Sequence, residues 1–116
     1  MANYALRYFF DPGSGICLWA GCDAARDRFG YPVAARQLPL PRATRERISQ
    51  LVDWYDRSVD WEYPAGPSLW DADEVEHFAR AARQLLGVLR VQLGPDFDVR
   101  DELAATMPEV SPTRVG

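Results

Sequence analysis

The chain of 116 residues has no lysine, one histidine, two cysteines and no long apolar run. Its thirteen basic residues are all arginine, and seventeen carboxylates outnumber them, which gives a net charge of −4. Nucleic-acid binding requires clustered cations, so we expect no nucleic-acid partner. The longest apolar run, residues 85–89, is far shorter than the ~20 residues of a membrane span. The first residues lack a charged start and Arg7 interrupts the apolar stretch after them. We therefore expect no signal peptide, no membrane contact and a cytoplasmic location.

Cysteine and histidine are scarce, so the chain has few side chains of these types to act as metal ligands. Cys17, Cys22 and His77 fall short of the four ligands that a structural zinc site needs. Without an export signal, the two thiols are expected to be free and packed rather than bridged. We therefore predict no metal, no cofactor and no catalytic residue. One alternative stays open: Asp73 and Glu74 lie one turn before His77, where a carboxylate could hold its ring in a small active site.

Short apolar segments separated by turn sequences predict the strands. An aromatic segment at 4–10 and an apolar one at 16–19, joined by the turn sequence at 11–15, predict a β-hairpin. The alternating segment 97–100 predicts a third strand. Three prolines within 31–41 exclude a helix interior there and indicate an extended segment.

Apolar residues at helical spacing predict the helices. The expected helices are 23–29, 42–58 and a long one that begins at Asp71 or Asp73 and ends before Gly94 and Pro95. The sequence thus predicts an α+β fold, in which a small antiparallel sheet packs against about three helices. We expect the hairpin and the C-terminal strand to form that sheet within one domain, residues 1–107, followed by a flexible tail at 108–116.

Charge and aromatic residues are concentrated between positions 53 and 76. This segment holds eight carboxylates against Arg57 alone, a net charge of −7, and three of the four tryptophans. In one interpretation, the acids are helix-terminal charges and the rings belong to the core. In the other, the acids steer a basic partner and the aromatic side chains anchor it.

The two interpretations apply to different residues of the segment. The acids from Asp71 to Glu74 begin a helix, and Tyr55 and Trp70 suit the core. No structural role is evident for the loop at 60–68, whose length without periodicity is typical of functional loops, or for the carboxylates of the adjoining helix. The predicted partner-binding residues are Asp53, Asp56, Asp60, Trp61, Glu62 and Tyr63.

Several short motifs carry a resemblance to a known class of proteins. They are SGICLWA at 14–20, FGYPV at 29–33, LPL at 38–40, WYD-x-S at 54–58 and W-x-YP-x-GPS-x-W at 61–70. Together they make most of residues 4–102 similar to small uncharacterised bacterial proteins of the toxin-immunity type. The resemblance implies a non-catalytic cytoplasmic protein that blocks a toxin, often a basic one, through electrostatically steered binding. It transfers no active-site residue.

Two other functions compete with this one. The first is the small enzyme that would use His77 with its neighbouring carboxylates. The second is an assembly subunit that forms a homodimer, in which the edge of the N-terminal hairpin pairs with another copy of the chain.

Overall fold

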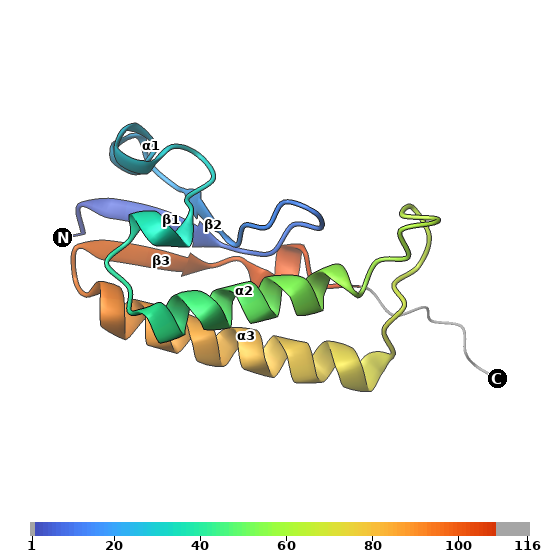
Figure 1. Ribbon diagram of the computed structural model, residues 1–116. Coiled ribbons are helices and arrows are strands. Elements are labelled where there is room, and N and C mark those ends of the chain that lie inside the picture. The colour runs from blue at the N-terminus through green and yellow to red at the C-terminus, as the bar shows by residue number, and fades with distance from the viewer. Residues whose placement is uncertain (1, 109–116) are drawn as a thin grey trace.

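The structure is a computed structural model and describes residues 2–108. Within these residues the fold has a three-stranded sheet, three α-helices and two short 3₁₀ turns (Figure 1). Its elements are β1 (Tyr4–Tyr8), β2 (Leu18–Ala20), α1 (Asp23–Phe29), η1 (Ala35–Gln37), α2 (Arg42–Asp56), α3 (Ala72–Leu93), β3 (Phe97–Asp101) and η2 (Leu103–Ala105). The predicted α+β class, with a small sheet and about three helices, is confirmed. The predicted tail lies outside the described residues except for Pro108.

The sheet has the order β2-β1-β3, with β1 in the centre. β1 and β2 form the predicted antiparallel hairpin. β3 runs parallel to β1, pairing Tyr4 with Phe97 and Tyr8 with Asp101, so the prediction of an entirely antiparallel sheet is wrong in this detail. Parallel neighbours require a crossover connection. The antiparallel pair α2 and α3 belongs to that connection and returns the chain to the end of the sheet from which β1 starts (Figure 1).

Both edges of the sheet are partly occupied by other segments. Outside β2, the Ala20 amide donates to the Tyr31 carbonyl at 2.7 Å and the Val33 amide donates to the Leu18 carbonyl at 2.9 Å. Outside β3, Arg90 of α3 donates from Nε and Nη2 to the Val99 carbonyl at 3.0 and 2.8 Å. Covered edges resist pairing with another chain. The hairpin edge that a strand-paired homodimer would use is therefore already hydrogen-bonded within the chain.

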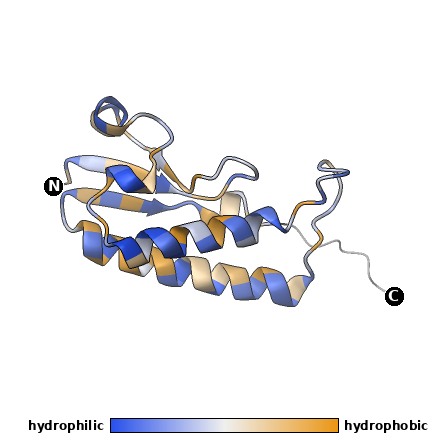
Figure 2. Ribbon diagram, in the orientation of Figure 1, coloured by the Kyte–Doolittle hydropathy of each residue, from blue (hydrophilic) through white to orange (hydrophobic). Residues whose placement is uncertain are grey.

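Helices α2 and α3 lie side by side against one face of the sheet (Figure 1). Hydrophobic and hydrophilic residues alternate along both, so each turns an apolar face inward (Figure 2). Helix α3 begins where the Asp71 side chain accepts the Glu74 amide at 2.8 Å, and it ends at Gly94, whose φ of 77° favours glycine. Among the described residues, no helix is both long and apolar enough to cross a membrane.

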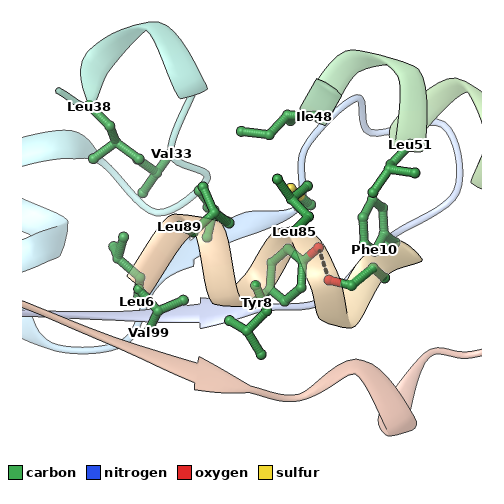
Figure 3. Packing of buried hydrophobic residues seen from close by; sticks show 14 of the residues in the cluster. Leu6, Tyr8, Phe10, Val33, Leu38, Ile48, Leu51, Leu85, Leu89 and Val99 are labelled. Atoms are coloured by element: carbon green, nitrogen blue, oxygen red, sulfur yellow. Dashed lines mark hydrogen bonds between the residues drawn. The ribbon is translucent and has the colours of Figure 1, made fainter. Parts of the chain in front are cut away.

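The core lies between the sheet and these two helices (Figure 3). Leu6, Tyr8 and Val99 point from the sheet toward Leu85 and Leu89 of α3, and all five are buried. The Tyr8 hydroxyl satisfies its burial by donating to the Ala82 carbonyl at 2.9 Å.

Replacing Tyr8 with Phe is expected to lower the free energy of unfolding by about 0.5–1.5 kcal/mol, because it removes one buried hydrogen bond while keeping the ring. Urea denaturation measures the change. The matched control is Tyr63→Phe: this side chain is 63% exposed and its hydroxyl makes no hydrogen bond to residues 2–108, so its effect should stay within about 0.5 kcal/mol. Equal losses in the two variants would contradict the assigned role of the Tyr8 hydroxyl.

Candidate functional site

The six predicted partner-binding residues all lie at one end of a molecule that measures 50 × 24 × 23 Å. Asp53 and Asp56 belong to the last turns of α2, and the other four belong to the loop between α2 and α3, which projects away from the sheet (Figure 1). Trp61 is 54% exposed and Tyr63 is 63% exposed, which is unusual for such large apolar rings. Asp53 and Glu62 are also exposed, and Asp56 and Asp60 are half-buried.

A clamp formed by Asp56 and Trp61 joins this loop to the loop between β1 and β2. The Trp61 indole Nε1 donates to the Asp56 carbonyl oxygen at 3.0 Å. The Asp56 side chain in turn accepts the Gly13 amide through Oδ1 at 3.0 Å. The Trp61 ring also lies against Gly13, since a Cβ built there would be 3.4 Å from its Cη2 atom. Gly13 has a φ of +79°, a backbone conformation that favours glycine.

Local contacts shape the rest of the loop. Asp60 accepts the Glu62 amide on Oδ1 at 3.0 Å and the Tyr63 amide on its carbonyl at 2.9 Å, which forms a tight turn. The Tyr63 ring lies over Gly66, where an added Cβ would be 2.5 Å from Tyr63 Cδ2. At the neck of the loop, the carbonyl of buried Ser58 accepts the Leu69 amide at 2.8 Å. The exposed side chains thus stand on a folded loop.

An aromatic cluster supports the base of the loop. Phe78 of α3 is fully buried at its centre. The rings around Phe78, with centroid distances of 5.1 to 5.6 Å, are those of Phe10, Trp54, Tyr55 and Trp70. Such contacts immobilise the elements from which the loop leaves and to which it returns. Tyr55 and Trp70 pack inward as predicted, whereas Trp61 points outward.

The acidic residues at this end separate into structural and free groups. Asp71 caps α3, and Glu74 accepts the Trp54 indole N–H on Oε2 at 2.6 Å. By contrast, Asp53 and Glu62 make no side-chain hydrogen bond or ion pair to residues 2–108. Asp11, exposed on the β1–β2 loop, was missed in the sequence. The loop that carries Asp11 is joined to the site by the Gly13–Asp56 hydrogen bond. This bond links positions 43 residues apart, so no local sequence pattern could predict it.

Within residues 2–108, no hydrogen bond or ion pair joins His77 to Asp73 or Glu74, the residues considered for catalysis. His77 is exposed, and its side chain makes no hydrogen bond to residues 2–108. Glu74, one of the two carboxylates expected to hold it, is bound to Trp54 instead. Within residues 2–108, no three His, Cys, Asp or Glu side chains are grouped to hold a metal ion.

The two cysteines are free, as predicted. Cys17 is fully buried, and this burial raises the pKa of its thiol to about 12. Cys22 is half-buried, and the Ala5 amide donates to its Sγ at 3.2 Å, which lowers the pKa of that thiol.

Comparison with known families matches this chain to one of them. The family model described as "Serratia CdiI immunity protein-like" matches residues 13–100, more than half of the chain. The chain belongs to the Serratia CdiI immunity protein-like family. It is therefore, in general terms, a protein of the toxin-immunity type, as the motif resemblance implied. No curated protein matches the chain.

The matched range of this CdiI immunity-like chain includes all six predicted residues and both partners of the Gly13–Asp56 hydrogen bond. It begins after β1 and ends within β3. Family membership does not by itself say which part of the surface meets a partner, so the assignment of the six residues stays a prediction.

Proposed function

We propose that this protein neutralises a cognate bacterial toxin by non-catalytic binding through the acidic, aromatic loop end. The proposed binding surface, hereafter the loop surface, consists of Asp53, Asp56, Asp60, Trp61, Glu62 and Tyr63. One observation carries the proposal: Trp61 and Tyr63 are exposed although the loop that holds them is fixed at its neck and by the Asp56 clamp. Exposed aromatic rings on a fixed support are typical anchors of a protein interface.

The charge of the loop surface favours a basic partner. Four of its six residues are carboxylates and none is a cation, and they belong to the segment 53–76, whose net charge is −7 while the chain as a whole carries −4. A concentrated charge of one sign accelerates the approach of an oppositely charged protein and orients it before contact. Bound there, the protein would cover the basic groove with which a toxin holds its own substrate.

Preorganisation supports tight binding by the loop surface. Ordering a free loop at an interface costs about 0.5–1.5 kcal/mol for each immobilised flexible side chain. The Asp56 clamp and the Tyr63–Gly66 packing already order part of the loop in the free protein, so they lower this free-energy cost of binding. We place this activity in the cytoplasm, with a protein as the partner and neither nucleic acid nor membrane.

Co-purification tests the proposal. The full chain, tagged, is expected to retain the product of the gene adjacent to its own at low ionic strength and to lose part of it as salt is raised. The variant Glu62→Arg reverses one exposed charge of the loop surface, and it should not retain the product at low salt. If nothing is retained at low salt, or if Glu62→Arg retains the product as well as the original chain does, the proposal is wrong.

Asp53→Asn is expected to slow association with that partner several-fold at low salt and to weaken the salt dependence of the rate, with little change in dissociation. The reason is that Asp53 is exposed and unpaired among the described residues, at the rim of the loop surface. Stopped-flow or biosensor kinetics at two ionic strengths measure the effect. Asp27→Asn is the matched control, because it removes the same charge from exposed α1 at the other end of the molecule. Equal slowing by both variants would show a general charge effect and no local site.

A further inference from the structure

The outer side of the helical layer carries a groove that the loop surface does not use. It consists of a hollow of about 270 Å³ between α2 and α3 and an adjoining hollow of about 410 Å³ on α3, which share Gln84 and Val88 in their linings. Thr44 of α2 donates from Oγ1 to Gln92 Oε1 of α3 at 2.7 Å and so joins the two helices at the groove. Except for Ala81, the residues of α3 that line it, from Gln84 to Gln92, belong to the half of this helix farther from the loop surface, as the course of α3 in Figure 1 shows.

Apolar residues in the groove are exposed without serving the core. Val91 is 80% exposed and Val88 is 38% exposed. Gly87 stands beside them in mid-helix, and a Cβ built there would touch nothing within 4 Å. Glycine inside a helix costs about 1 kcal/mol relative to alanine. Hydrophobic residues are closely spaced along this half of α3 (Figure 2). The packing of the described chain explains neither the glycine nor the exposed valines.

The charged residue that lines the groove is Arg47 of α2. Arg83 does not line it but lies one turn before Gly87 on α3. Neither arginine forms an ion pair within residues 2–108. The amide N–H groups of Gln84 and Gln92 add further hydrogen-bond donors. A second copy docked groove to groove would present the same arginine, so charge does not favour a symmetric dimer as the occupant.

We propose that this groove binds an amphipathic helix of another protein, one that is apolar on one face and rich in carboxylates along its edges. Its apolar face would cover Val88 and Val91, and the missing side chain at Gly87 lets a helix backbone approach closely. Its carboxylates would meet Arg47 and Arg83. Asp53, the residue of the loop surface nearest in sequence, follows Arg47 by about 9 Å along α2. The groove and the loop surface share no residue, and this inference does not rest on the proposed toxin binding.

A designed peptide tests the groove directly. The probe is a labelled helix of about 18 residues, with Leu at i, i+3, i+4 and i+7 and Glu at most other positions, titrated with the full chain by fluorescence anisotropy. Saturable binding is expected. Val91→Glu should weaken it at least tenfold, because it places a carboxylate on the apolar strip. Leu69→Glu is the matched control, since Leu69 is 62% exposed at the opposite end, and it should leave peptide binding unchanged.

Four results would overturn the inference. The first is no saturable binding of the acidic probe. The second is equal binding by Val91→Glu and Leu69→Glu. The third is tighter binding of a probe that has Lys in place of Glu. The fourth is a dimer of the original chain in analytical ultracentrifugation that Val91→Glu dissociates, which would make a second copy the occupant. Urea denaturation of Val91→Glu is the control for folding, and the variant should be as stable as the original chain because residue 91 is so exposed.

Discussion

Phe78→Ala is expected to lower the free energy of unfolding by about 3–5 kcal/mol, the range for losing a buried aromatic ring together with the cavity left behind. Phe78 is fully buried, and four rings of the β1–β2 loop, α2 and the α2–α3 loop pack around it. Since a domain of this size has only about 5–15 kcal/mol of stability in total, the variant should be near its folding threshold. Urea denaturation at constant m-value gives the change.

Phe78→Leu is the conservative comparison for this position. It keeps much of the apolar volume and should lose clearly less stability than the alanine variant. The near-ultraviolet circular dichroism of Phe78→Ala should also decrease, because Trp54 and Trp70 lose the ring that both contact. A loss below about 1 kcal/mol would place Phe78 outside a packed cluster and would remove the rigid base assigned to the loop surface.

Trp61→Ala is expected to weaken binding of the cognate toxin by about 2 kcal/mol or more, roughly 30-fold in Kd. The substitution removes an exposed aromatic anchor. It also removes the indole N–H that binds the Asp56 carbonyl and the ring that lies against Gly13. Isothermal titration calorimetry with the purified toxin domain measures the change. Stability should change little, because the side chain is more than half exposed.

Two variants separate the possible causes of that loss. Trp61→Phe keeps an aromatic ring without the N–H donor, so an intermediate loss is expected if the clamp to Asp56 contributes to binding. Val91→Ala removes an even more exposed apolar side chain at the other end of the molecule and should leave the affinity unchanged. Equal losses for Trp61→Ala and Val91→Ala would contradict the assigned position of the interface.

Local patterns were sufficient to predict most elements of the fold. Helix α3 spans Ala72–Leu93, between the caps Asp71 and Gly94. Asp71 is one of the two predicted starts and Gly94 is the predicted stop, because capping groups and an apolar stripe define both limits within the segment itself. The direction of β3 was predicted wrongly. Strand direction depends on the path of the chain through α2 and α3, and a four-residue alternating pattern contains no information about that path.

The exposure of side chains on the α2–α3 loop was predictable in part. The charges and aromatic rings of this loop indicated that Trp61 and Glu62 face outward, and both are exposed. Their role in partner binding stays a prediction. The role of Asp56 in holding Gly13 was not predictable, because it requires two loops to meet across 43 residues of sequence. The groove was missed for a related reason: Val88 and Val91 are ordinary helix residues until the packing leaves them outside.

Titration of toxin activity with the purified protein tests the central claim most directly. Binding without catalysis predicts that inhibition is complete at one molecule per toxin, that intact active toxin is recovered on dissociation, and that Trp61→Ala shifts the titration to higher concentration. Inactivation by substoichiometric amounts of protein, or a titration that Trp61→Ala leaves unchanged, would contradict neutralisation by the loop surface.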